Sequence, residues 1–174
     1  QGKHEEAFAT YQTALKLDPN NHVILMNSSL TATRLAKYDI AEKRCKLGLS
    51  LAPNYYLNWP FLYQTYLMQG SKGNEIKELV SEVENISNKN KDIYTVLTHY
   101  YWKKDPQKYQ SYLEAARNYN KNETRGKHEI DFYQIPEGKI DEFIKLANER
   151  FDAGTFNYVF EANLFVNEVK SDPR

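Results

Sequence analysis

A spacing of 34 residues recurs along the chain and constrains its fold more than any other feature of the sequence. One set of positions separated by this interval is Gly2, Ala36, Gly70, Lys104 and Gly138. Two shorter sets in the same register are Ala7 with Ala41 and Pro19 with Pro53. A fixed period of this length indicates a repeated supersecondary unit, which buries its apolar face only by stacking on a neighbouring unit.

Apolar residues recur at helical spacing between polar turns, and no segment shows the alternation typical of a strand. Pro19 and Pro53 are expected to end units, because proline disfavours helix in the residue before it. Gly70 is expected to end a helix as a C′ glycine, and the basic and aromatic stretch 117–128 is expected to be a solvated loop. The predicted helices are 3–17, 22–35, 40–51, 56–69, 74–86, 92–102, 107–119, 129–135, 139–153 and 155–170.

Charge and composition exclude several classes of function. The 174 residues include 23 basic and 23 acidic side chains, which cancel. A neutral chain lacks the overall field that attracts nucleic acid or anionic lipid. No apolar run approaches the roughly 18 residues that span a bilayer. We therefore expect no direct nucleic-acid binding and no membrane insertion, and we expect the chain to be cytoplasmic.

Residues that could carry chemistry are few and scattered. Cys45 is the single cysteine, so an internal disulfide and multi-cysteine zinc spacings are excluded. Its position predicts a buried structural thiol rather than a nucleophile. The four histidines form no metal-binding pair, and the glutamate pairs fit charged helix faces. The sequence therefore predicts no catalytic residues, no metal, no cofactor and no enzyme activity.

Side chains in the first half of the chain resemble the tetratricopeptide repeat family. Trp59, Leu62 and Tyr66 have the spacing of its first helix, with Tyr63 where the family has glycine. Ala41 begins the second-helix pattern, and the resemblance is strongest over residues 1–86. Three small residues, Ala14, Gly48 and Ala116, share a position where helices approach closely. Three others share a position expected in the core, namely Leu25, Trp59 and Ile93.

The resemblance implies an all-α solenoid of antiparallel helix pairs stacked as a right-handed superhelix. One repeat domain is expected over 1–174, as a fragment of a longer protein. Its parts would be half a repeat (1–21), two repeats (22–55 and 56–90), a degenerate repeat (91–120) and a divergent repeat with a C-terminal cap (128–174). The segments 138–143 and 170–174 also resemble the end of repeat domains in bacterial transcriptional regulators and nucleotide cyclases.

In this family the first helix of each pair lines a concave groove, which implies a binding surface. The residues that would line it are Val23, Met26, Asn27, Leu30, Thr33, Arg34, Leu57, Phe61, Gln64, Leu67 and Met68. They are largely apolar, which suits a peptide or protein segment with apolar anchors. The leading hypothesis is a non-catalytic protein–protein interaction module. A sensory or regulatory domain of a bacterial regulator is the alternative, and self-association stays open.

Overall fold

The computed structural model describes residues 2–53, 55, 57–102 and 104–122, and beyond them only 138, 139, 141, 142 and 145. For residues 120–122 only the backbone is described. The chain divides into two compact units, residues 1–88 and 89–174, and each is considered by itself. All seven helices in the described ranges are α-helices, and no strand occurs there. The described part of the protein is therefore all-α, as the sequence predicts.

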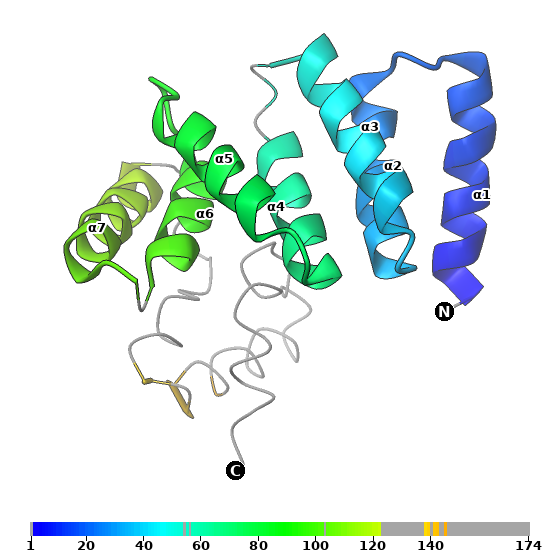
Figure 1. Ribbon diagram of the computed structural model, residues 1–174. Helices are drawn as coiled ribbons and strands as arrows, with labels where there is room; N and C mark the ends of the chain where they lie inside the picture. The colour runs from blue at the N-terminus through cyan, green and yellow to red at the C-terminus, as the bar shows by residue number, and fades with distance from the viewer. Residues whose placement is uncertain are drawn as a thin grey trace. The chain divides into compact units, whose positions relative to one another are not determined.

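The first unit contains five helices, which Figure 1 shows running alternately in opposite directions. From α1 to α5, each helix packs on the next one along the chain, and α2 also contacts α4. The helices are α1 (Gly2–Leu17), α2 (His22–Arg34), α3 (Tyr38–Leu51), α4 (Asn58–Gln69) and α5 (Gly73–Glu84). In the second unit α6 (Lys91–Tyr101) packs on α7 (Pro106–Asn122).

Three of the five positions spaced by 34 residues have a left-handed backbone. Ala36 has φ 55°, Gly70 has φ 76° and Gly138 has φ 77°. After α2 the N–H of Lys37 bonds to the carbonyl of Ala32 at 2.9 Å, which closes the helix end. These three positions have a conformation that favours glycine, and the expected role of Gly70 at the end of α4 is confirmed.

Side-chain caps begin three of the helices. Asn21 and Asn90 are the N-cap residues of α2 and α6, and the carbonyl oxygens of their side chains accept bonds from Ile24 and Ile93 N–H, both at 3.1 Å. Asp105 Oδ1 accepts bonds from the N–H groups of the second and third residues of α7. The first residue of α7 is a proline, which suits this position because it has no N–H to satisfy. Each cap satisfies donors that the first helical turn leaves without partners.

The core repeats with the same period as the turns. Ser28, Leu62 and Val96 are spaced by 34 residues and are at most 4% exposed. A second set with this spacing, Cys45, Leu79 and Leu113, is equally buried. Equivalent positions therefore face the interior in three successive helix pairs. This equivalence supports the repeat interpretation, although the division of the chain into repeats and the superhelical stack remain predictions.

Gly48 allows α3 and α4 to pack closely. A methyl group built at Gly48 would lie 2.8 Å from Oδ1 of Asn58, which is fully buried at the start of α4. Such a distance is shorter than real carbon contacts allow, so a larger side chain would push the helices apart. Close approach at this position was expected from the small residue, and at Gly48 it is confirmed.

The seven helices start and end within three residues of the ranges expected from the sequence. One expectation is wrong: residues 120–122, which were expected in the solvated loop, belong to α7, which extends three residues beyond the predicted helix over 107–119. Helices predicted over 129–135, 139–153 and 155–170 fall outside the described residues, apart from isolated positions.

Candidate interaction surface

A pair of buried threonines holds α2 against α4. The hydroxyl oxygens of Thr33 and Thr65 lie 2.8 Å apart and share a hydrogen bond. Thr33 Oγ1 also lies 3.0 Å from the carbonyl oxygen of Ser29, and Thr65 Oγ1 lies 2.8 Å from the carbonyl oxygen of Phe61. Each hydroxyl has one proton, so one threonine donates to the other, and the one that accepts donates to the carbonyl on its own helix. Because both hydroxyl groups are buried and hydrogen-bonded, they link the helices without leaving a polar group unsatisfied.

The eleven residues predicted to line a groove lie on these two helices or at the start of α4, and we call them the α2/α4 face. Three of them, Met26, Thr33 and Gln64, are buried, so a partner would reach them only if neighbouring side chains moved. The other eight are at least partly exposed. Arg34 is exposed, and Val23 and Met68 are 41% and 51% exposed. The remaining five are half-buried, namely Asn27, Leu30, Leu57, Phe61 and Leu67. Eight predicted residues are therefore accessible to a partner, but binding by this face remains a prediction.

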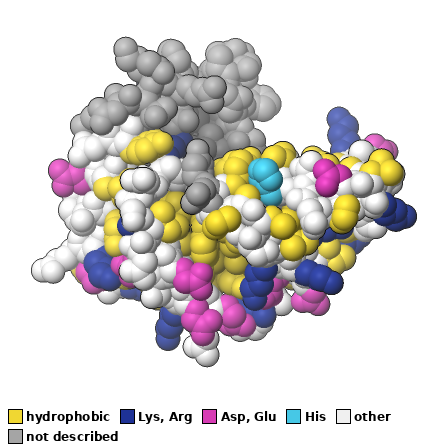
Figure 2. All heavy atoms as spheres, turned by 90° about the horizontal axis from the view of Figure 1, so that it is seen from above, with side chains coloured by type: hydrophobic (Ala, Val, Ile, Leu, Met, Phe, Trp, Pro, Cys, Tyr) yellow, Lys and Arg dark blue, Asp and Glu magenta, His cyan; other side chains and the backbone are white. Residues whose placement is uncertain are grey.

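The described surface carries charges of both signs. Figure 2 shows acidic and basic side chains interspersed with exposed hydrophobic ones on the face that it draws. This mixture agrees with the zero formal net charge of the chain. Among the described residues, no group of three or more His, Cys, Asp or Glu could hold a metal ion. None of the helices in this part of the chain is long and apolar enough to cross a membrane.

The expected burial of Cys45 is confirmed. Its side chain is fully buried, and Sγ donates to Oγ of Ser29 at 3.1 Å. Burial raises the pKa of the Cys45 thiol to about 12, against the opposing effect of the Ser29 hydrogen bond. The thiol therefore stays protonated near neutral pH and is a poor nucleophile.

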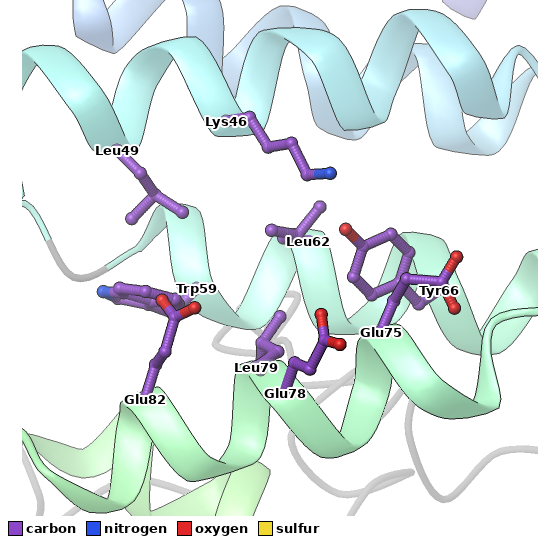
Figure 3. A pocket seen from close by; sticks show the side chains of 9 residues that line it. All are labelled: Lys46, Leu49, Trp59, Leu62, Tyr66, Glu75, Glu78, Leu79 and Glu82. Carbon is purple, nitrogen blue, oxygen red and sulfur yellow. The ribbon is translucent and has the colours of Figure 1, made fainter.

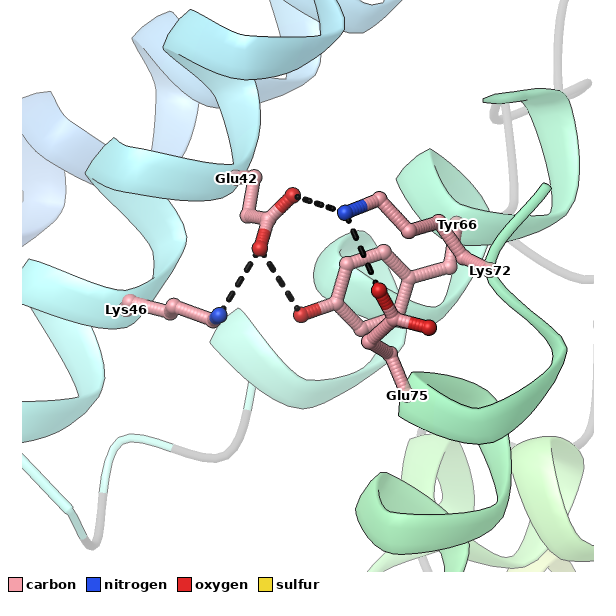
Figure 4. Close-up of polar contacts among 5 residues, drawn as sticks. All are labelled: Glu42, Lys46, Tyr66, Lys72 and Glu75. Atoms are coloured by element: carbon pink, nitrogen blue, oxygen red, sulfur yellow. Dashed lines mark hydrogen bonds and ion pairs between the residues drawn. The ribbon is translucent and has the colours of Figure 1, made fainter. Parts of the chain in front are cut away.

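A polar network joins α3, α4 and the start of α5, as Figure 4 shows. Glu42 accepts a hydrogen bond from Lys46 at 2.7 Å and one from the Tyr66 hydroxyl at 3.3 Å. Its other oxygen lies 3.4 Å from Lys72, which also pairs with Glu75 at 3.1 Å. The network connects three helices through one carboxylate. Sequence reasoning missed it, because Glu42 is distant in the chain from Tyr66 and Lys72.

The pKa of Glu42 reflects two opposing influences. Burial raises the pKa of the carboxyl, but the hydrogen bond and charge of Lys46, helped by Lys72, outweigh it and lower the pKa below its ordinary value. The hydrogen bond to Glu42 in turn raises the pKa of Lys46. Burial raises the pKa of the Tyr66 hydroxyl. The network is therefore ionised at Glu42 and Lys46 near neutral pH, which suits a structural ion pair.

A pocket of about 280 Å³ lies between α3, α4 and α5. Its lining includes Trp59, which the sequence placed in the core with Leu25 and Ile93. Those two are buried, but Trp59 is only half-buried and faces the pocket. The core assignment of Trp59 is therefore only partly correct. The spacing of Glu75, Glu78 and Glu82 along α5 could have indicated an acidic stripe there.

Comparison with known proteins gives partial matches. No family model matches the chain. Over 93 residues, 51% of the chain, it is 32% identical to RNA polymerase II-associated protein 3 of Xenopus tropicalis. Over 55 residues, 32% of the chain, it is 36% identical to the protein of that name in Rattus norvegicus. The matched segments span 14% and 8% of these relatives, so the similarity concerns a small part of each.

Proposed function

We propose that this chain is a non-catalytic protein-interaction module and that it binds a partner segment along the α2/α4 face. On this proposal the helix pairs form a superhelical array of the tetratricopeptide type. The observation that carries the proposal is the exposure of Val23 and Met68 on helices that are otherwise well packed, at 41% and 51%. Apolar side chains exposed on a rigid helix pair are suitable anchors for a peptide or a partner helix.

The chemistry of the face fits such a partner. Methionine is adaptable in shape, so Met68 can accommodate different apolar anchors. Asn27 donates from its side-chain nitrogen to the carbonyl of Val23 at 3.0 Å. This bond leaves the side-chain oxygen of Asn27 to accept a bond from a partner's backbone N–H. A partner would thus gain apolar contact together with a directional polar contact.

The relatives favour binding over catalysis. They are named for their association with RNA polymerase II, which is a contact with a protein assembly rather than a reaction. These relatives come from Xenopus tropicalis and Rattus norvegicus, and their name does not support the alternative of a bacterial regulatory domain. That alternative depends on the segments 138–143 and 170–174, of which the structure describes only isolated positions.

A matched pair of double variants tests the proposal. Val23→Ser with Met68→Ser removes two apolar anchors from the face. Leu17→Ser with Leu51→Ser makes the same chemical change at residues that are 85% and 43% exposed on α1 and α3. The experiment immobilises each chain, captures proteins from an extract and identifies them by mass spectrometry.

We expect the first variant to lose partners that the unmodified chain and the second variant retain. Removing one or two buried anchors weakens an interface by about 2 kcal/mol or more. Circular dichroism should show the same helix content in all three chains, because the changed residues are exposed. Retention of the same partners by the Val23→Ser, Met68→Ser chain would contradict the proposal.

A further inference from the structure

The pocket between α3, α4 and α5 has a composition unlike that of the α2/α4 face. Figure 3 shows Lys46 and Leu49 on α3, Trp59, Leu62 and Tyr66 on α4, and four residues of α5 around one hollow. The four are Glu75, Glu78, Leu79 and Glu82. None of these nine residues belongs to the α2/α4 face, so the pocket is a separate surface within residues 1–88.

The charges around the pocket do not cancel. Lys46 is engaged by Glu42 at 2.7 Å, and Glu75 is engaged by Lys72 at 3.1 Å. Within the described ranges, the carboxylates of Glu78 and Glu82 have neither a hydrogen bond nor an ion pair, and both residues are exposed. These two residues are four apart on α5, so their carboxylates are neighbours on one helix face. The pocket therefore has two carboxylates whose charge is not neutralised.

The rest of the pocket is apolar and includes an aromatic ring. Leu62 and Leu79 are buried beneath it, and Leu49 and Trp59 are half-buried at its side. Trp59 and Glu82 both line the pocket, as Figure 3 shows. An indole face attracts a cation within about 6 Å. Carboxylates beside an apolar surface and an indole form an environment for a side chain that is aliphatic along its length and cationic at its end.

We propose that this pocket receives an arginine side chain from a basic segment of a partner protein. The methylene groups would lie on Leu62 and Leu79, and the guanidinium would bond to Glu78 and Glu82 beside Trp59. Arginine fits better than lysine, because its planar group pairs with carboxylates through two bonds and stacks on aromatic rings. The volume, about 280 Å³, is below the roughly 300–1,000 Å³ of most small-molecule sites.

The test uses nuclear magnetic resonance on the ¹⁵N-labelled 174-residue chain. The indole N–H signal of Trp59, assigned with the Trp59→Phe variant, is followed while a short peptide of alternating leucine and arginine is added. A second peptide carries citrulline in place of arginine, which keeps the shape and removes the charge. The titrations are repeated with Glu78→Gln, Glu82→Gln and with Glu6→Gln, Glu114→Gln, whose glutamates are exposed on other helices.

We expect the Trp59 signal to shift to saturation as the arginine peptide is added. The citrulline peptide should bind at least about tenfold more weakly. Glu78→Gln, Glu82→Gln should lose at least about tenfold in affinity, while the Glu6→Gln, Glu114→Gln control keeps it. The Val23→Ser, Met68→Ser chain should also respond normally, which separates this proposal from the function of the α2/α4 face. Binding should weaken as salt rises from about 50 to 500 mM.

Three outcomes would overturn the proposal. The first is a Trp59 signal that does not move with the arginine peptide. The second is an equal response in the Glu78→Gln, Glu82→Gln chain and its control. The third is a dimer of the chain, detected by sedimentation, that Glu78→Gln, Glu82→Gln dissociates, since the occupant would then be a second copy.

Discussion

Ala36 occupies a backbone conformation that glycine adopts at two equivalent positions, Gly70 and Gly138. Its φ is 55°, beside 76° at Gly70 and 77° at Gly138. The Cβ of an L-residue crowds the following carbonyl in this region, which costs about 1 kcal/mol. At one of its turns the chain therefore carries a strain that glycine would relieve.

Replacing Ala36 by glycine should stabilise the fold despite the entropy that glycine adds to the unfolded chain. We expect Ala36→Gly to raise the free energy of unfolding by about 0.5 kcal/mol. The same substitution at Ala9, exposed within α1, should lower it by about 0.5–1 kcal/mol. Urea denaturation measures both. Equal destabilisation at the two sites would show that Ala36 is not strained.

The lowered pKa of Glu42 predicts how acid affects the network of Glu42, Lys46 and Tyr66. A carboxyl with a lowered pKa stabilises the fold above its unfolded pKa of about 4.3, and this contribution is lost as the pH falls through the folded value. Allowing for solvent screening, we expect Glu42→Gln to cost about 0.5–1 kcal/mol at neutral pH.

The difference in the free energy of unfolding between the Glu42→Gln chain and the unmodified chain should disappear at low pH. The protonated Glu42 carboxyl is nearly identical in shape to glutamine and carries no charge, so the two chains should unfold with similar free energies once the pH is below the lowered pKa of Glu42 in the folded chain. Urea titrations of both chains at neutral and acidic pH provide the measurement. A gap that stays constant across the pH range would mean that ionisation of Glu42 contributes nothing.

At the scale of helices, Gly48 controls the distance between α3 and α4. Gly48→Ala should destabilise the protein by about 1–3 kcal/mol, because the new methyl group meets Asn58 at 2.8 Å. Gly73→Ala, where no heavy atom lies within 4 Å, should be neutral or stabilising. Thermal unfolding of the two variants distinguishes packing from helix propensity.

Asn58 offers a further control for the Gly48 prediction. Its side-chain nitrogen and oxygen are both buried without a hydrogen-bond partner in the described part of the chain. Shortening it to alanine makes room beside position 48, so Gly48→Ala combined with Asn58→Ala should be more stable than the sum of the single changes predicts. Strict additivity would mean that the two residues do not compete for space.

Periodicity and turn residues were enough to predict the helices, and the error at α7 shows where such reasoning fails. Residues 120–122 are polar and were predicted as a loop beyond the helix over 107–119, yet they continue the helix. Leu113 and Ala116 are buried, and the helix extends beyond its last core contact with polar side chains. Polarity at the end of a helix therefore did not identify the boundary.

The α2/α4 face was only partly predictable, because sequence spacing gives a helix face and not what packs against it. Thr33 was expected to be accessible, but it is buried where α2 packs on α4 and shares a hydrogen bond with Thr65. Trp59 was expected in the core, but it lines the pocket with Glu82. Contacts between residues distant in the chain determine the burial of Thr33 and the position of Trp59, and a local sequence pattern does not predict such contacts.

At the scale of the whole molecule, two surfaces of different chemistry occur within residues 1–88. The α2/α4 face is mainly apolar, whereas the pocket of α3, α4 and α5 carries carboxylates. A partner with an apolar segment and a basic one could engage both, and the linked contacts would then bind more tightly than either alone. This arrangement suits an interaction module whose formal net charge is zero.

The central claim, that the α2/α4 face binds a protein, is tested most directly by photo-crosslinking at single positions. A benzophenone amino acid is placed at Val23 or Met68 on the face, and at Leu17 or Leu51 away from it. Under ultraviolet light, we predict that the chains labelled at Val23 and Met68 form a crosslink to the same partner and that those labelled at Leu17 and Leu51 do not. Crosslinks to the captured partner from Leu17 and Leu51, with none from Val23 and Met68, would contradict the claim.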